Sequence, residues 1–390
     1  MKVCMITTSF PRWEGDGQGS FIFELSRALV REGVQVQVIA MHSPGAAVYE
    51  YIDGIKIFRP RYLWPERLEM LRKEGGGLPA TWKKHPWVLW EIGPLIMAQT
   101  AALLRLIQDS CLIHAHWSLS AGIGWLGKCF HRGSPPVIVT VHGSDIFQVT
   151  KYLLGTMLTR LILRRCNRVI AVSQALANEV INLGINPNKV VVISNGVDVE
   201  RFKPLPPQHR QNIILYVGSL IERKGVKFLL AAMPNVFAAL PDYQLLIVGE
   251  GPQYPMLKQM TESLNIADKV VFLGFQSYDQ VRTLMQRAKL LVLPSIEEAQ
   301  GVVLLEALAC GTPVVASKVG GIPEVVTRDV GVLVPSANPA ALSEAIISIL
   351  TNSKIWLDMS HQARVRAENV YNWKEIAKQT ISVYKEVLGL

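Results

Sequence analysis

Two glutamates eight positions apart, Glu298 and Glu306, have unusual surroundings in the second half of the chain. Glu298 lies in a polar loop after a short apolar run, and Glu306 interrupts the otherwise apolar stretch VVLLEALAC at 302–310. A carboxylate without hydrogen-bond partners in apolar surroundings costs roughly several kcal/mol. The vicinal hydroxyl groups of a ribose are suitable donors, so Glu306 is a candidate ribose ligand.

Two adjacent cations, Arg223 and Lys224, follow another apolar run and precede Gly225. Positive side chains at the carboxyl edge of a sheet, with a glycine at the start of the next helix, are suited to bind a diphosphate. A solvated charged loop explains these residues equally well when they are considered alone.

Three glycines separate the first apolar run from a helical pattern: Gly15, Gly17 and Gly19. Glycine lets the backbone approach a phosphate, and a helix N-terminus offers free N–H groups and a positive dipole. The spacing differs from G-x-G-x-x-G, and no acid closes the second apolar run, which ends at His42. An NAD site is therefore not predicted, and an ordinary flexible turn remains the alternative.

His142 lies in a Thr-Val-His-Gly-Ser-Asp turn at 140–145, after another apolar run. An imidazole there can exchange hydrogen bonds with a ligand or stabilise charge, and a turn histidine held by Asp145 is the alternative. His114 and His116 share one face of a strand, as a metal pair does. No third ligand is near and no Asp-x-Asp motif occurs, so two packed histidines are favoured and no metal site is predicted.

These candidate residues depend on a scaffold of alternating elements. Apolar β-branched runs alternate with helical patterns, which is typical of parallel sheets covered by helices on both faces. Ligands bind such sheets outside the carboxyl ends of the strands, and clefts between domains are preferred sites. We predict strands at 2–8, 34–40, 111–117, 137–141, 168–173, 190–194, 212–218, 243–249, 269–274, 289–294, 313–317 and 330–334. We predict helices at 20–31, 175–183, 254–264 and 302–310, and two more between 353 and 388.

Length and composition indicate two hydrophobic cores. The chain has 390 residues, of which 49% are hydrophobic and 18% charged, and this length suits two domains better than one. The break between the two strand sets falls near 195–196, and the Pro-rich stretch 203–211 is predicted to be a linker. Five scattered cysteines without CxxC spacing favour a reducing compartment over a disulfide framework or a zinc ribbon.

The net charge of +9 favours anionic partners. Residues 151–168 contain basic side chains and no acid, and residues 61–90 combine Arg and Lys with aromatic side chains. Such surfaces suit an anionic bilayer, whereas core aromatics and a solvated basic face are an equal alternative. The apolar stretch 86–107 is interrupted by charged, Pro and Gly residues, so no membrane-spanning helix is predicted. The side chains concerned are Lys151, Arg160, Arg164, Arg165 and Arg168, and Tyr62, Trp64, Trp82, Trp87 and Trp90.

Several motifs together resemble those of the retaining glycosyltransferases of family 4, which have the GT-B architecture. They are the E-x7-E block at 294–317, Gly-Gly-Ile-Pro-Glu at 320–324, Gly-Glu-Gly-Pro at 249–252, Asn-Gly-Val-Asp at 195–198 and His-Gly-Ser-Asp at 142–145. The resemblance covers nearly the whole chain and implies two Rossmann-like parallel-sheet domains facing a central cleft. It implies an acceptor-side domain at 1–195, a sugar-nucleotide-binding domain at 196–370 and, at 371–390, a C-terminal helix that crosses back to the first domain.

The resemblance also implies roles for single residues. Lys224, helped by Arg223, would bind the diphosphate, Glu306 the ribose and Glu298 the hydroxyls of the donor sugar. His142 would lie beside the anomeric carbon. The implied catalytic residues are His142, Glu298 and Lys224, and the implied donor-binding residues are Gly17, Gly19, Arg223, Lys224, Gly249, Phe275, Glu298, Gly301, Val302, Val303 and Glu306. Family members often carry Arg where this chain has Ser219, and an aromatic residue where it has Gln300.

The implied reaction transfers a hexose-type sugar, with retention, from a nucleoside-diphosphate donor to an acceptor hydroxyl. A UDP-sugar is favoured over GDP-mannose, the acceptor is lipid-linked or a polysaccharide, and neither a metal nor a cofactor is expected. The expected location is the cytoplasm, at the inner face of the membrane. A GT-B-like sugar-nucleotide epimerase and a non-catalytic nucleotide- or RNA-binding protein are the alternatives. No nucleic-acid partner is expected, because the basic residues do not cluster with an RNA-binding motif.

Overall fold

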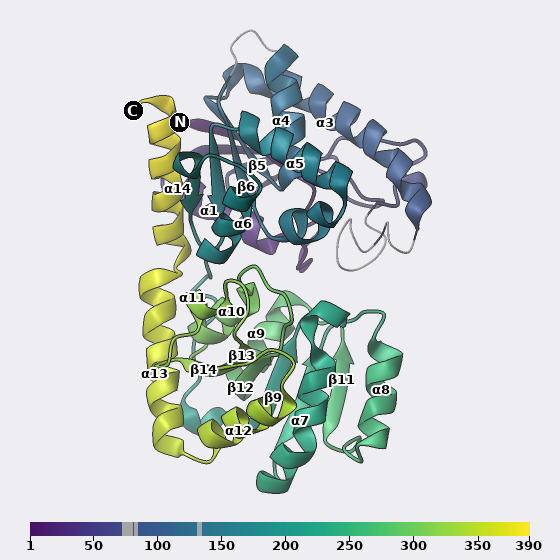
Figure 1. Ribbon diagram of the computed structural model, residues 1–390. Helices are drawn as coiled ribbons and strands as arrows, with labels where there is room; N and C mark the ends of the chain where they lie inside the picture. Colours follow the sequence, from purple (N-terminus) through teal and green to yellow (C-terminus); the bar gives the residue numbers. More distant parts are fainter. Residues whose placement is uncertain (72–80, 82–84, 131–134) are drawn as a thin grey trace. The chain divides into compact units, whose positions relative to one another are not determined.

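The computed structural model describes residues 1–71, 81, 85–130 and 135–390 of the chain. It contains two units (Figure 1): Met1–Asn195 together with Trp373–Leu390, and Gly196–Asn372. Each unit has its own sheet and hydrophobic core, so the predicted α/β fold with two parallel-sheet domains is confirmed. The second unit extends past position 370, because Val197 N donates to Tyr371 O at 2.7 Å and Val197 pairs with Asn372 in a parallel bridge.

The first unit contains an eight-stranded sheet in the order β3-β4-β2-β1-β5-β6-β7-β8. Neighbouring strands are parallel except for β3 and β4. The central strands are buried almost throughout, which explains their continuous apolar sequences. The strands are β1 (Lys2–Thr7), β2 (Gln35–Ala40), β3 (Tyr49–Ile52), β4 (Ile55–Phe58), β5 (Leu112–His116), β6 (Val137–Val141), β7 (Arg168–Ala171) and β8 (Val190–Val192).

The edge hairpin of β3 and β4 is missing from the sequence-based prediction. Asp53 and Gly54 join the two strands with φ angles of 51° and 81°, as a two-residue type I′ turn requires. An Asp-Gly pair between two alternating segments is the sequence signal that identifies such a hairpin. Because β3 is antiparallel to β4, the first sheet is mixed at this edge.

Helices of the first unit cover its sheet. The C-terminal helix α14, yellow in Figure 1, packs beside α1, and Leu29 of α1 and Tyr384 of α14 are fully buried in one core. The longer helices are α1 (Ser20–Arg31), α3 (Ile92–Leu106), α4 (Ser118–Phe130), α5 (Leu153–Arg165), α6 (Gln174–Asn182) and α14 (Trp373–Leu388). The short ones are η1 (Glu66–Leu68), η2 (Pro86–Glu91), η3 (Ile107–Asp109), η4 (Ser144–Gln148), η5 (Val149–Lys151) and η6 (Pro187–Lys189).

The second unit contains a six-stranded, wholly parallel sheet in the order β11-β10-β9-β12-β13-β14. Its strands are β9 (Gln211–Val217), β10 (Gln244–Val248), β11 (Val270–Gly274), β12 (Ala288–Leu293), β13 (Val314–Ser317) and β14 (Gly331–Val334). Its helices are η7 (Pro207–His209), η8 (Glu222–Lys224), α7 (Val226–Ala239), α8 (Tyr254–Ser263), α9 (Tyr278–Arg287), α10 (Val302–Ala309), α11 (Ile322–Val325), α12 (Pro339–Leu350) and α13 (Ser353–Val370).

The predicted linker at 203–211 is wrong, because this stretch belongs to the second unit. The guanidinium group of Arg210 is buried and donates hydrogen bonds to Ala288 O at 2.8 Å, to Thr312 Oγ1 at 2.8 Å and to Gly311 O at 3.0 Å. A composition rich in Pro and polar residues therefore marks a packed connection here, held in place by one arginine.

In each sheet the chain order reverses between two adjacent strands, β1 and β5 in the first unit and β9 and β12 in the second. The loops that leave such strands diverge, and open α/β sheets bind ligands in the resulting crevice at the carboxyl ends. Lys224 follows β9 and Glu298 follows β12. The topology of the second sheet thus accounts for the meeting of two residues far apart in the sequence.

Candidate active site

The loops at the carboxyl edge of the second sheet are joined by backbone hydrogen bonds. Ile296 N donates to Arg223 O at 2.7 Å, which ties the loop after β12 to the loop after β9. Leu220 N donates to Glu250 O at 2.8 Å, and Gly249 N donates to the last residue of β11 at 2.8 Å. These bonds hold the loops after four strands in a fixed arrangement.

Lys224 and Glu298 form an ion pair at the switch point of this sheet, the place between β9 and β12 where the chain order reverses. Only 16% of the Lys224 side chain and 10% of the Glu298 side chain are exposed, and Ser295 Oγ donates to Glu298 Oε2 at 3.4 Å. Burial alone would raise the pKa of Glu298, but the charge and hydrogen bond of Lys224, with the charge of Arg223, lower it below its usual value. The pair is therefore ionised at neutral pH.

Two helices start beside this pair. Gly225 precedes α7 with φ of 67°, and a Cβ atom there would lie 2.0 Å from Pro294 O, so only glycine allows the loops after β9 and β12 to approach so closely. Gly301 precedes α10, and Val302 and Val303 are its first residues. The first N–H groups of a helix lack intrahelical partners and lie at its positive end. The start of α10 can therefore bind a negatively charged group.

Glu306 lies one turn further along α10 and has partners different from those of Glu298. The Tyr278 side chain at the start of α9 hydrogen-bonds to the Glu306 carboxyl group, and the Arg201 guanidinium lies 4.6 Å from the Tyr278 ring centroid. Burial raises the pKa of Glu306 to about 7, although the Tyr278 hydrogen bond and the Arg201 charge act in the opposite direction. The two glutamates of the E-x7-E block therefore have separate surroundings.

The pKa of Glu306 predicts a pH-dependent stability. An acid whose pKa is about 7 in the folded chain and near 4.5 otherwise holds its proton more tightly when folded, so stability falls as the pH rises through this interval. Glutamine does not titrate, so Glu306→Gln should not show this fall in stability with pH. The Tm of the variant relative to that of the wild type should therefore rise from pH 5 to pH 8. Thermal unfolding across this range measures it, and a pH-independent difference contradicts the assignment.

Gly249 and Phe275 border the second sheet's carboxyl edge farther from the ion pair. The Phe275 side chain is 61% exposed, and Phe275 N donates to Glu250 Oε1 at 3.4 Å. An exposed ring on a hydrogen-bonded loop is a suitable surface for a planar ligand such as a nucleobase.

In the first unit, the loop between β1 and α1 is held by an internal ion pair. Asp16 accepts from Arg12 Nε at 2.7 Å and from Gln18 N at 3.2 Å. Burial acts to raise the pKa of Asp16, but the hydrogen bonds from Arg12 and Gln18 outweigh it and lower the pKa. The loop therefore has a defined conformation and is more than a flexible turn.

Gly17 and Gly19 differ in what the fold demands of them. At Gly19 φ is 69°, and a Cβ atom would lie 2.5 Å from Ser9 O, whereas a Cβ atom at Gly17 would have no neighbour within 4 Å. The strain in Gly19→Ala should lower the free energy of unfolding by roughly 1–3 kcal/mol, and so lower the Tm. Gly17→Ala should leave the Tm unchanged. Thermal unfolding of both variants checks this, and equal Tm values would contradict it.

His142 follows β6 and lies among aromatic rings. The ring centroids of Phe21 and Trp117 lie 4.8 Å and 4.9 Å from that of His142. Asp145 Oδ1 accepts from the backbone N–H of His142 and of Gly143, both at 3.2 Å, and this fixes the turn. Burial, with a smaller contribution from His114, lowers the pKa of His142 to about 3. His142 is thus a neutral hydrogen-bonding group at physiological pH.

His114 and His116 both have hydrogen-bonding contacts within the first unit. His114 Nδ1 lies 2.6 Å from Tyr384 Oη and its Nε2 lies 2.7 Å from Thr140 Oγ1, while His116 Nδ1 lies 3.0 Å from His142 Nε2. Among the residues that the structure describes, no group of three or more His, Cys, Asp or Glu side chains is arranged to hold a metal ion. Independence from metal stays a prediction.

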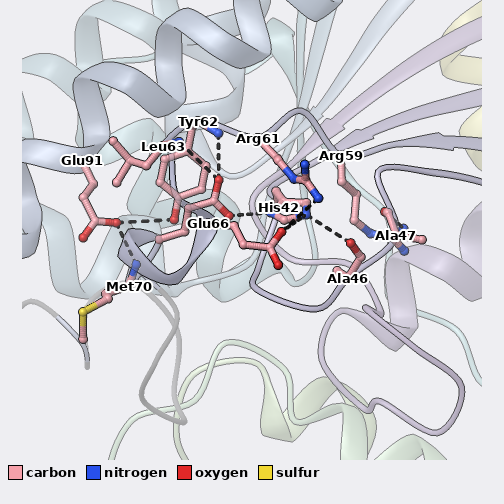
Figure 2. A network of polar contacts seen from close by, with 11 residues as sticks. His42, Ala46, Ala47, Arg59, Arg61, Tyr62, Leu63, Glu66, Met70 and Glu91 are labelled. Atoms are coloured by element: carbon pink, nitrogen blue, oxygen red, sulfur yellow. Dashed lines mark hydrogen bonds and ion pairs between the residues drawn. The ribbon is translucent and has the colours of Figure 1, made fainter.

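A buried polar network fixes the segment after β4 (Figure 2). His42 follows β2, and its Nδ1 lies 2.5 Å from Glu69 Oε2, while its Nε2 lies 3.1 Å from Ala46 O. Arg59 NH2 donates to Pro11 O at 2.6 Å, at the beginning of the loop that carries Gly17 and Gly19. His42 thus joins the segment after β2 to Glu69, and Arg59 joins the end of β4 to the β1–α1 loop.

The basic and aromatic segments differ in exposure. Trp64, Trp87 and Trp90 are exposed, Tyr62 is buried with its hydroxyl 3.4 Å from Glu91 Oε2, and Trp82 lies outside the described residues. On α5 five apolar side chains are exposed together with three arginines of the same helix, whereas Leu163 is buried. The exposed aliphatic residues are Leu153, Leu154, Met157, Leu158 and Leu161, and the arginines are Arg160, Arg164 and Arg165.

By length and composition alone, Pro86–Leu106 is apolar enough to cross a membrane. One face of this stretch packs in the first unit, however, where Leu95 and Leu103 are fully buried and Gln99 Nε2 donates to Thr7 O at 3.4 Å. Its other face exposes Trp87, Trp90 and Met97.

The structure places one group of predicted site residues in the second unit, in η8, in α10 or in loops at the carboxyl edge of the sheet: Arg223, Lys224, Gly249, Phe275, Glu298, Gly301, Val302, Val303 and Glu306. Gly17, Gly19 and His142 belong to the first unit. Sequence reasoning missed Ser295, Tyr278 and Arg201 as partners of the glutamates. No local pattern marks Arg201 and Tyr278, because they are distant in sequence from Glu306.

Two family models match the chain: Glycosyltransferase Family 4 at residues 15–201 and Glycosyl transferases group 1 at residues 198–368. A component of the phosphatidylinositol N-acetylglucosaminyltransferase of Arabidopsis thaliana is 31% identical over 400 residues, which are 100% of this chain and 82% of that protein. The chain belongs to the family 4 glycosyltransferases. Membership confirms the resemblance drawn from the motifs and makes this protein a glycosyltransferase.

Solved structures share the fold of this glycosyltransferase. Sucrose-phosphate synthase from Thermosynechococcus elongatus has a TM-score of 0.80 at 24% identity, covering 100% of this chain and 99% of that one. Anabaena HepE in complex with UDP-glucose has a TM-score of 0.75 at 19% identity, covering 99% and 100%. The likeness extends over both units, so the GT-B assignment holds for the whole chain.

Proposed function

We propose that this glycosyltransferase moves a hexose-type sugar, with retention, from a nucleoside-diphosphate donor to an acceptor hydroxyl. The observation that carries the proposal is the Lys224–Glu298 ion pair at the switch point between β9 and β12. The cation suits the donor's diphosphate, and the carboxylate suits the hydroxyls of the transferred sugar. A UDP-sugar is the favoured donor and GDP-mannose the second, a choice supported by the UDP-glucose complex of the similar HepE.

The mechanism follows from the charges at this edge of the sheet. Lys224, Arg223 and the first amides of α10 stabilise the negative charge that develops on the leaving diphosphate, the kind of stabilisation that preorganised sites supply best. Glu306 binds the ribose, and His142 acts as a neutral hydrogen-bonding group at the anomeric carbon. The leaving phosphate accepts the proton of the acceptor hydroxyl on the same face, so that the configuration is retained. No metal or cofactor has a step in this scheme.

The acceptor in this proposal is lipid-linked, with a polysaccharide as the second choice, and the protein works in the cytoplasm at the inner face of the membrane. The name of the Arabidopsis relative, a phosphatidylinositol N-acetylglucosaminyltransferase, supports a lipid. So does α5, where Leu153 and Leu154 are 80% and 68% exposed. No acid occurs between Lys151 and Arg168, so this face is complementary to an anionic bilayer.

The α5 face gives a testable binding site. Leu154→Glu combined with Met157→Glu should abolish co-sedimentation with vesicles of phosphatidylcholine and phosphatidylglycerol at low salt, because it places two acids at the centre of the apolar face. Leu357→Glu, at an exposed leucine of α13, is the matched control and should still bind. All three proteins should share one Tm. Equal sedimentation of the double variant and the control contradicts membrane binding through α5.

The reaction itself is tested by product analysis. The wild type is incubated with UDP-glucose, UDP-N-acetylglucosamine or GDP-mannose and a phosphatidylinositol acceptor, and the product is examined by NMR. We expect one donor to give a glycoside with the donor's anomeric configuration. Release of an isomerised sugar without an acceptor would identify an epimerase. The family and the relatives above support neither an epimerase nor a nucleotide- or RNA-binding protein.

A further inference from the structure

His116 contacts the histidine of the proposed active site and has no role in the scheme above. It ends β5, and His142 follows the neighbouring strand β6. Nδ1 of His116 lies 3.0 Å from Nε2 of His142, and the two rings are nearly parallel at 19° with centroids 5.3 Å apart. His116 is 1% exposed, so water does not compete for this contact. Both rings line a pocket within the first unit, together with Thr140 and Trp373.

The hydrogen bond has a direction. Burial lowers the pKa of both imidazoles far enough that they are neutral at physiological pH, so one nitrogen of the pair donates and the other accepts. Nε2 of His116 is buried and has no partner among the described residues. If His142 donated, His116 would carry its own proton on that Nε2, as a buried donor without an acceptor. Unpartnered buried N–H donors are rarer in native proteins than unpartnered acceptors.

We infer that His116 is a positioning residue whose Nδ1–H donates to Nε2 of His142 and so keeps the proton of His142 on Nδ1. His142 is partly exposed, and the hydrogen bond of its ring among the described residues is made by Nε2. His142 therefore presents a fixed N–H donor to a substrate oxygen, with a ring plane set by His116 on one side and by Phe21 and Trp117 on the others. This inference rests on the proposed function for its catalytic consequence.

Two substitutions separate the hydrogen bond from the packing. The amide nitrogen of Asn occupies the position of Nδ1 of histidine, and the amide of Gln occupies that of Nε2. His116→Asn should therefore retain kcat within about threefold, whereas His116→Gln should lower kcat about 100-fold, the cost expected of a misplaced group, with a much smaller change in the KM for the donor. Equal kcat values for the two variants would overturn the inference.

The protonation of His142 is read directly from the ¹⁵N chemical shifts of its ring in histidine-labelled protein. In the wild type and in His116→Asn, Nδ1 should carry the proton, and in His116→Gln the tautomers should mix. His114→Asn is the matched control, since His114 is a buried neighbour whose partners are Tyr384 and Thr140, and it should leave the tautomer of His142 unchanged. A wild-type His142 protonated on Nε2 overturns the inference. This readout needs no turnover, so absence of transferase activity would reject the proposed function and leave the positioning role testable.

Discussion

Lys224→Met should lower kcat/KM for the sugar nucleotide about 1,000-fold. The variant loses the cation assigned to the leaving diphosphate, and removal of one preorganised charge-stabilising group costs about 100- to 1,000-fold in kcat alone. Loss of its partner also leaves the buried Glu298 carboxylate uncompensated, which destabilises the fold. Turnover and Tm must therefore be measured together.

A double variant and a neighbouring lysine provide the controls for this result. Lys224→Met combined with Glu298→Gln removes both charges and should recover much of the lost Tm but none of the activity. Lys227→Met, three residues further along in α7 and paired with Glu222, should change kcat/KM less than about threefold. If Lys224→Met and Lys227→Met have equal activity, Lys224 has no role in donor binding.

Glu298→Ala should reduce kcat at least about 100-fold while the protein stays folded. Its carboxylate is buried, ionised and held by Lys224 and Ser295, and in the proposed mechanism it binds the hydroxyls of the donor sugar. Each lost charged hydrogen bond removes about 1.5–3 kcal/mol of transition-state stabilisation. Lys224, which loses its partner, adds to the loss of activity. Initial rates at saturating donor measure kcat.

Glu297→Ala is the matched control for this substitution, because Glu297 is the adjacent carboxylate in the same loop. It should keep kcat within about threefold. Unimpaired turnover in Glu298→Ala would remove this residue from the site.

Periodicity was sufficient to predict most of the fold. Each of the predicted strands has a counterpart, because buried parallel strands have continuous apolar sequences such as Val137–Val141. The predicted helix at 20–31 has the observed bounds of α1, Ser20–Arg31, with Gly19 as its N-cap. The hairpin β3–β4 is half-exposed and has no continuous apolar run, so its Asp-Gly turn is the sequence signal that indicates it. The Arg210 contacts that bind 203–211 to the second unit join segments far apart in the chain, so composition alone suggested a linker.

The candidate site was predictable where a motif and a strand end coincide. Lys224 and Glu298 each follow an apolar strand, but their ion pair depends on β9 and β12 being adjacent, which only the sheet order reveals. His116 and His142 likewise meet because β5 and β6 are neighbours. From the sequence His116 could be assigned only to a strand face, so its contact with His142 was missed.

The central claim, that the second unit binds a nucleoside diphosphate through Lys224, is tested most directly by thermal unfolding with UDP, GDP, ADP and NAD, with and without magnesium. A ligand at 100 times its Kd stabilises a fold by about 2.7 kcal/mol. We expect UDP, or else GDP, to raise the Tm of the wild type without magnesium and to have little effect on Lys224→Met. Failure of every nucleotide to raise the wild-type Tm, or an equal rise in Lys224→Met, would contradict the account.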